Sequence, residues 1–315
     1  GMVLDEKLNG IPVHRNVADA IAHASCMPDY FIYGKAPASG RLSTPERLIV
    51  LDAIATGMSV VNGLHEFLSD DPEFVAASEA MNVTLTDVRK PRAKSDMHTY
   101  SGKIETVTCP RIAVLGTDCA IGKRTTATVL TRALNERGLK AVMIGTGQTG
   151  LMQGARYGIA LDAVPSQFCA GELEAKIVEA FEHDSPDVII IEGQGALSHP
   201  AYSTSSFILR GSRPDGVVLQ HAPARAHRCD FEQMAMPDPA TEINLIQTFA
   251  DTRVIGLTIN HEFMSEVEVD AAIVDYEREL NIPVTDALTR SPERLVEMTF
   301  AAFPELENKS CVDVH

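Results

Sequence analysis

The sequence predicts an α/β protein built on a doubly wound parallel sheet, preceded by a smaller α/β domain. Three observations lead to this prediction. Short apolar segments alternate with helical patterns along most of the 315 residues, which is typical of parallel sheets covered by helices. The segment IAVL at 112–115 is a continuous apolar strand that enters a glycine-containing loop and then a helix. A second apolar strand, at 187–191, ends in Glu192 followed by Gly-Gln-Gly.

The composition limits the classes of function and partner. Hydrophobic residues make up 45% and charged residues 22%, as in globular proteins with a sizeable core. The net charge of −16, from 27 basic and 43 acidic residues, argues against a nucleic-acid partner, because phosphate backbones bind clustered Lys and Arg. No apolar run approaches the roughly 20 residues that span a bilayer, and no signal peptide is visible. We therefore expect no membrane partner and a cytoplasmic location.

Residues 1–91 are predicted to form a small domain of Rossmann-like type. Asn16 is a suitable N-cap for a helix that ends near residue 24, and Thr44-Pro45-Glu46 is a strong start for a second helix, which ends before Gly57. The opening strand and helix of such domains are not found, and this domain is expected to lack them. Strands are expected at 29–34, 59–62 and 83–87, and an interrupted helix at 64–80.

Residues 92–109 are polar and lack a strong period, so we predict a linker, or a strand pair that crosses to the second domain. Residues 110–315 form that second domain. After its first strand, a helix is expected at 123–137, with its apolar residues on one face and Gly138 at its end. Further strands are expected at 140–144, 187–191, 216–220, 254–259 and near 284, and helices at 171–183, 241–251, 265–280 and 291–302.

The loop GTDCAIGKRTT, at 116–126, predicts a P-loop NTPase-like phosphate site. Backbone N–H groups at the start of a helix point toward an anion, and Lys123 adds a positive charge. Five residues, not four, separate Gly116 from Gly122, and Arg124 stands where Ser or Thr normally binds magnesium. The residues expected to bind the phosphates of a cofactor are Gly116, Thr117, Asp118, Ala120, Gly122, Lys123, Arg124, Thr125 and Thr126.

Several segments resemble one family of two-domain proteins, the DgcN-type family. They are GTDCAIGKRTT, GTGQTG (145–150), EGQGALSHPAY (192–202), GSRPDGVVLQH (211–221) and GLTINHE (256–262). The upstream segments GRLSTPER, VVNGLHEFLSDD and DVRKP fit the same family, so the resemblance covers nearly the whole chain. It implies a Rossmann-like domain followed by a P-loop domain similar to dethiobiotin synthetase, a branch that also spaces its glycines by five. The implied activity is D-glutamate N-acetyltransfer from acetyl-CoA.

Such a reaction needs a base for the ammonium proton and donors for the oxyanion. Glu192 and His199 are the candidate catalytic residues, because ligands bind past the carboxyl ends of parallel strands. Glu192 could instead be a structural carboxylate, and His199 a loop residue bonded to the backbone. Arg213 precedes a strand and is less well placed than the arginines that follow one. The candidates for binding an acidic amino acid are Gln148, Thr149, Gln194, Arg225 and Arg228.

The identity of the bound phosphate stays open. An arginine at position 124 cannot bind a metal but can pair with phosphate, which favours metal-free anchoring of acetyl-CoA. Alternatively, Thr125 takes the metal position, and the protein is an ATP- and Mg²⁺-dependent synthetase or amide ligase with Glu192 as a metal ligand. A third hypothesis is a nucleotide-binding regulatory protein without turnover.

The cysteines and histidines give weaker signals. No two of the six cysteines form a CxxC pair, and the set His221, His227, Cys229 and Asp230 matches no strong zinc spacing, so no metal site is expected. Cys119 lies near a helix N-terminus, where thiol pKa values fall, which gives a covalent acyl-cysteine route as an alternative. A homo-oligomer is expected on base rates.

Overall fold

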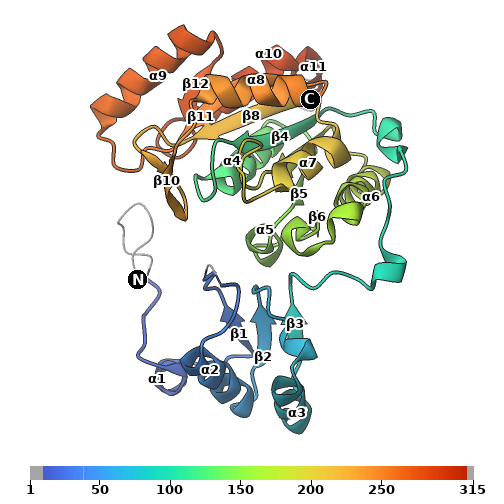
Figure 1. The fold of residues 1–315 in the computed structure, drawn as a ribbon, viewed down its shortest axis with the longest axis vertical. Helices are drawn as coiled ribbons and strands as arrows, with labels where there is room; N and C mark the ends of the chain where they lie inside the picture. The colour runs from blue at the N-terminus through green and yellow to red at the C-terminus, as the bar shows by residue number, and fades with distance from the viewer. Residues whose placement is uncertain (1–9, 38, 311–315) are drawn as a thin grey trace. The chain divides into compact units, whose positions relative to one another are not determined.

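The computed structural model describes residues 10–37 and 39–310, and the chain divides into two compact units, Gly1–Lys90 and Pro91–His315 (Figure 1). The elements of the first unit are α1 (Val17–His23), β1 (Tyr30–Tyr33), α2 (Thr44–Ala55), β2 (Ser59–Asn62), α3 (Pro72–Met81) and β3 (Leu85–Asp87). Its three strands form a parallel sheet in the order β1-β2-β3. Asn16 caps α1 as predicted, since its side chain accepts a hydrogen bond of 2.8 Å from the backbone of Asp19.

The helix predicted over 64–80 is wrong in its first half. The chain forms a 3-10 turn at Leu68–Asp70, and the helix begins only at Pro72. The carboxylate of Asp87, at the end of β3, accepts hydrogen bonds from the backbone N–H groups of Leu68 and Ser69, at 3.0 and 2.9 Å. These bonds occupy backbone groups that a continuous helix would need.

The second unit is built on a seven-stranded sheet. Its strands are β4 (Arg111–Gly116), β5 (Ala141–Gly145), β6 (Tyr157–Gly158), β7 (Val188–Glu192), β8 (Gly216–His221), β11 (Arg253–Ile259) and β12 (Val284–Asp286). They lie in the order β12-β11-β8-β4-β7-β5-β6, and every neighbouring pair is parallel. The predicted doubly wound parallel sheet is therefore confirmed.

Helices cover both faces of this sheet (Figure 1). They are α4 (Lys123–Glu136), α5 (Gln148–Met152), α6 (Ser166–Asp184), α7 (Thr204–Ser212), α8 (Pro239–Phe249), α9 (Glu266–Leu280), α10 (Glu293–Ala302) and α11 (Pro304–Ser310). Alternate residues of a strand enter different cores, as the two-residue repeat of a strand requires. Ile112 and Val114 of β4 pack in the core shared with α4, α10 and α11. Ala113 and Leu115 pack in the core shared with α6, α7, α8 and α9.

Residues 92–109, for which we expected a linker or a strand pair, contain 3-10 turns and no strand. They pack on α6 through two buried carboxylates. Glu172 accepts a 2.6 Å hydrogen bond from the backbone of His98, and Glu174 accepts one of 3.1 Å from the backbone of Ile104. The segment is therefore a packed part of the second unit.

Several short elements have no counterpart in the sequence predictions. They are α5, β6, α7, α11 and an antiparallel hairpin formed by β9 (His227–Arg228) and β10 (Phe231–Ala235). The longest of them, α7, has nine residues, so its period is sampled over few turns. The hairpin follows β8 and contributes directly to the candidate site described below.

Candidate functional site

The candidate site lies at the edge of the large sheet where β4, β5, β7, β8 and β11 end, because parallel strands bring their carboxyl ends together. The phosphate loop leaves β4 at Gly116 and enters α4 at Lys123. Gly122 is the N-cap of α4, with φ at +104°, a conformation that suits glycine. The predicted order of strand, loop and helix is present.

Side chains from two distant segments hold the carbonyl oxygens of this loop. Arg225 donates to the carbonyls of Cys119 and Ala120, at 2.9 and 3.2 Å, and Asn260 donates to that of Ile121, at 3.2 Å. In a trans peptide the N–H group points away from the carbonyl. The N–H groups of the loop are therefore directed away from these side chains and stay available for an anion.

Lys123 is buried, with 5% of its surface exposed, and its ammonium group donates to the backbone oxygen of Asp118. Burial lowers the pKa of Lys123 to about 8, while Cys119, Asp118 and Glu192 act in the opposite direction. Among the residues that the structure describes, none forms the close ion pair with Lys123 that a buried ammonium group ordinarily needs. An anion in the loop would supply it.

The position after the lysine holds no oxygen ligand. The side chain of Arg124 reaches across to Gln153, just after α5, and donates to its amide oxygen. The hydroxyl of Thr126 donates to Gln220 of β8, at 2.5 Å, and so contributes to the packing beneath the loop. Thr125, the alternative metal ligand, is the third residue of α4 and is half-buried.

Glu192 ends β7 and is buried beside the start of α5. Its Oε2 accepts a 2.9 Å hydrogen bond from the backbone of Thr146. Burial raises the pKa of Glu192, although this hydrogen bond and the charges of Arg124 and Lys123 act against the rise. A Cβ on Gly150 would lie 2.4 Å from Oε2, so the backbone of α5 closely limits where the carboxylate can lie.

Gly193 brings the chain after Glu192 into contact with β4. A Cβ at this position would lie 2.0 Å from the carbonyl oxygen of Val114. Gly193→Ala should therefore push the ends of the two strands apart and lower the free energy of unfolding by roughly 1–3 kcal/mol. Urea unfolding measures this loss. Gly34→Ala is the matched control, because nothing lies within 4 Å of its added Cβ. Equal losses in both variants would contradict the prediction.

His199 and Asp118 form a buried pair with two unsatisfied atoms. His199 Nε2 lies 3.8 Å from Asp118 Oδ1, and neither atom has a hydrogen-bond partner among the described residues. The other ring nitrogen, Nδ1, accepts from the backbone of Ala201 at 3.2 Å, so a neutral ring carries its proton on Nε2. Burial and the nearby Arg228 lower the pKa of His199, which keeps the ring neutral near pH 7. Tyr202 and Phe231 flank the ring.

The two arginines predicted to bind an acidic substrate lie at this site but differ in what they offer. All five N–H groups of Arg225 donate within the protein, to the phosphate loop and to Glu262, with which it forms a bidentate pair at 2.7 and 3.1 Å. Arg228 is buried and donates to the carbonyl of Thr117 and to Ser198, at 3.3 and 2.8 Å. These two bonds leave N–H groups of Arg228 for a ligand.

The uncharged candidates lie around the end of β5. Gln194 donates to the backbone oxygen of Thr146 at 2.6 Å and so joins the β7 loop to the β5 loop. Gln148 and Thr149, expected in a glycine-rich loop, are instead the first two residues of α5. Thr117, in the phosphate loop, shares a 2.8 Å hydrogen bond with His221 of β8.

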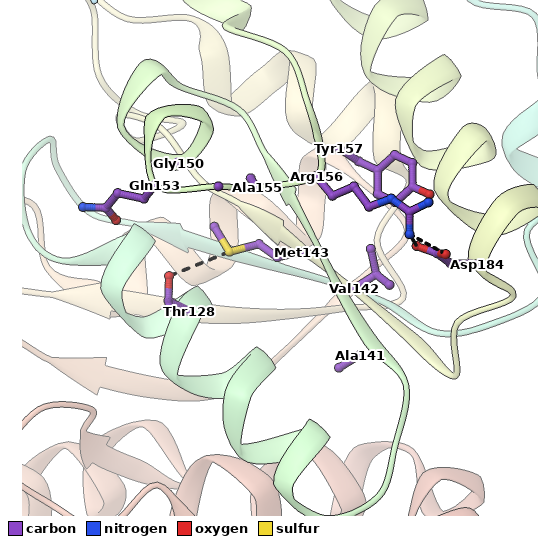
Figure 2. A pocket seen from close by; sticks show the side chains of 11 residues that line it. Thr128, Ala141, Val142, Met143, Gly150, Gln153, Ala155, Arg156, Tyr157 and Asp184 are labelled. Atoms are coloured by element: carbon purple, nitrogen blue, oxygen red, sulfur yellow. Dashed lines mark hydrogen bonds and ion pairs between the residues drawn. The ribbon is translucent and has the colours of Figure 1, made fainter. Parts of the chain in front are cut away.

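A hollow of about 340 Å³ lies beyond α5 (Figure 2). Two residues that line it also contact the candidate site. Gly150 limits the position of the Glu192 carboxylate, and Gln153 accepts a hydrogen bond from Arg124. The ion pair of Arg156 with Asp184, at 2.8 Å, lies at its other end (Figure 2).

The structure corrects the expectation about Cys119. Burial raises the pKa of Cys119 to about 11, so the expected lowering by the helix N-terminus is wrong, and the acyl-cysteine route loses its basis. Within the described ranges, one set of potential metal ligands, His14, Asp19 and His23, brings its ligand atoms within 4.8 Å of one another. That set belongs to the first unit, and its spacing was not recognised in the sequence.

Several further residues complete the site and were not predicted from the sequence. Asn260 and Glu262 follow β11 and connect it to the phosphate loop, and Gln220 of β8 holds the start of α4. The available signal was the position of Asn260 and Glu262 directly after a predicted strand. Tyr202 and Phe231 had no recognisable spacing, because the hairpin of β9 and β10 was not predicted.

A loop of this kind at the carboxyl edge of a parallel sheet defines a P-loop protein. The chain belongs to the DUF1611 family, whose profiles match residues 1–91 as a Rossmann-like domain and residues 98–296 as a P-loop domain. This confirms the resemblance drawn from the motifs. In the part of the chain that the structure describes, no helix is long and apolar enough to cross a bilayer.

Three similar proteins support this assignment. Proteins named D-glutamate N-acetyltransferase from Tritonibacter scottomollicae and a Pseudoalteromonas species are 30% and 31% identical over 275 residues. Each alignment covers 84% of this chain, and 79% and 80% of the relatives. The crystal structure of a DUF1611 family protein from Anabaena variabilis superposes with a TM-score of 0.85 at 30% identity. That superposition covers 92% of this chain and 84% of the other. At the level of the family, the comparisons support an N-acetyltransferase.

Proposed function

We propose that the protein transfers the acetyl group of acetyl-CoA to the amino group of D-glutamate or a similar acidic amino acid. One observation carries the proposal: a phosphate loop with arginine at the metal position lies beside Glu192, a buried carboxylate of raised pKa. The relatives named D-glutamate N-acetyltransferase support the same reaction.

The phosphate loop is proposed to hold phosphates of coenzyme A without a metal. Triphosphate chemistry uses Mg²⁺ bound by a hydroxyl of the loop. Here the residue after the lysine is Arg124, whose guanidinium carries only N–H donors and binds Gln153. Lys123 and the free N–H groups of the loop match the charge and geometry of a phosphate.

Glu192 is proposed to be the general base. The acceptor amine enters as an ammonium group and must lose one proton before it attacks the thioester carbon. A carboxylate whose pKa is raised by burial is a stronger base than an exposed one. After attack, the bond between carbon and sulfur breaks, and the second nitrogen proton goes to the leaving thiolate.

His199 is proposed to act as a donor. The proton on Nε2 is available because Nδ1 already accepts from the backbone of Ala201. This N–H group can stabilise the negative oxygen of the tetrahedral intermediate. The bond from Ala201 sets this tautomer, and Asp118, whose other oxygen Oδ2 accepts from the backbone of Cys229 at 2.7 Å, lies 3.8 Å from Nε2.

Arg228 is proposed to bind a carboxylate of the acceptor. It donates to Ser198, the neighbour of His199 in the chain, and its charge already lowers the pKa of that ring. Arg225 is proposed to shape the loop instead, because its N–H groups are all used within the protein. The net charge of the chain is −16, so an acidic substrate needs a local positive charge, which the buried Arg228 supplies.

The test is release of free thiol from acetyl-CoA in the presence of D-glutamate, measured with EDTA and with Mg²⁺. We expect equal rates under both conditions, and a much lower rate with L-glutamate. Arg124→Thr returns a hydroxyl to the metal position and should leave the thiol release independent of Mg²⁺. Release of phosphate from ATP that requires Mg²⁺, without thiol release, would instead identify the ATP-dependent alternative.

A further inference from the structure

Phe263 occupies an unusual position in the loop that follows β11. The residue is 90% exposed, and its backbone has φ at +61°. A hydrogen bond of 2.9 Å from the backbone of Met264 to that of His261 closes the turn around it. The third residue of such a turn is usually glycine or asparagine when φ is positive. A phenylalanine here is strained and leaves a large apolar surface in water.

The residues just before Phe263 hold the turn beside the phosphate loop. Glu262 forms the bidentate pair with Arg225, which in turn binds two carbonyls of the loop. Asn260 binds the carbonyl of Ile121 and also accepts from the backbone of Glu262, at 2.9 Å. The exposed ring is therefore carried by a rigid segment directly attached to the residues that shape the anion site.

We propose that Phe263 is the stacking surface for the adenine ring of the ligand whose phosphates lie in the loop. Aromatic side chains bind bases through their faces, and an exposed ring on a rigid backbone loses little freedom on stacking. Strained residues persist where the surrounding structure fixes them, and such positions cluster at ligand sites. The ligand class is an adenine nucleotide, and coenzyme A is the member that the proposed function requires.

The experiment measures the affinity of two ligands by calorimetry. Coenzyme A contains adenine, whereas 4′-phosphopantetheine lacks the adenosine part. We expect Phe263→Ala and Phe263→Gly to weaken coenzyme A binding roughly 10-fold and to leave 4′-phosphopantetheine binding unchanged. The glycine variant tolerates the positive φ, so its loss cannot be attributed to collapse of the turn. Phe249→Ala is the matched control, because Phe249 is also an exposed phenylalanine and is the last residue of α8. This variant should bind both ligands as the wild type does.

The outcomes separate this inference from the proposed function on which it rests. Unchanged affinity for coenzyme A in both Phe263 variants overturns the inference, as does an equal loss for both ligands. A change of oligomeric state without a change in affinity also overturns it, because the ring would then serve contacts between protein chains. If the wild type binds ATP and not coenzyme A, and Phe263→Ala weakens ATP, the adenine surface stands while the acetyl-CoA donor is wrong.

Discussion

Lys123→Met is expected to abolish phosphate binding and, at the same time, to stabilise the ligand-free protein. The ammonium group is buried, and its pKa falls from 10.5 to about 8, which corresponds to ~3 kcal/mol of disfavoured charge. Methionine fills similar space without the charge, so the free energy of unfolding should rise by roughly 1–3 kcal/mol at pH 7. Affinity for coenzyme A should fall more than about 100-fold, because a phosphate would lose its cationic partner.

The gain in stability should depend on pH. Between pH 8 and 10.5 the unfolded chain holds the lysine proton more tightly than the folded chain, so the wild type gains stability as pH rises. Below pH 8 the lysine is charged in both states, and its cost is constant. The difference between Lys123→Met and wild type should therefore shrink from pH 7 to pH 10. Urea unfolding at several pH values measures it.

Lys140→Met supplies the control for this comparison. Lys140 is more than half exposed and lies at the opposite edge of the sheet, before β5. Its replacement should change neither the stability at pH 7 beyond a few tenths of a kcal/mol nor the affinity for coenzyme A. A loss of stability in Lys123→Met would show that the buried ammonium group is not a cost to the fold.

Glu192→Gln is expected to reduce kcat by about 10²- to 10⁴-fold, the usual contribution of a general base. Affinity for coenzyme A should change little, because the glutamine oxygen can still accept from the backbone of Thr146. In the wild type, kcat/KM should rise with pH through the raised pKa of Glu192, since only the ionised carboxylate accepts a proton. The variant should lose this rise. Thiol release between pH 5 and 8 measures both effects.

Stability distinguishes a catalytic role of Glu192 from a structural one. When the pKa of a carboxyl group is higher in the folded chain than in the unfolded chain, the protein loses stability as pH rises between the two values. Glu192→Gln removes this loss, so it should be at least as stable as the wild type at pH 7. Glu174→Gln is the contrasting control: it removes a buried carboxylate that accepts from Ser101 and Ile104, so it should lower stability and leave kcat unchanged. If Glu192→Gln keeps the wild-type kcat, the base lies elsewhere.

The sequence was sufficient for the parts of the fold that are long and buried. The strands that became β4, β7 and β8 are continuous apolar runs because helices cover both faces of the sheet. The prediction failed where distant polar groups decide the local structure, as where Asp87 stops a helix before Pro72. It also failed for the hairpin of β9 and β10, which is short and carries no periodic pattern.

For the candidate site, the sequence indicated the edge of the sheet but not the partners of each side chain. The position of Glu192 followed from the end of its strand. The role of Arg225 did not, because its partners belong to the phosphate loop and to the turn after β11. The unsatisfied pair of Asp118 and His199 likewise joins two loops whose contact no spacing encodes.

The fixed carbonyls of the phosphate loop bear on how fast a ligand binds. Because Arg225 and Asn260 hold three successive carbonyls in place, the loop completes its ordering during folding. Association should then be limited by diffusion, with no preceding conformational step, and the observed rate should rise linearly with ligand concentration without reaching a plateau.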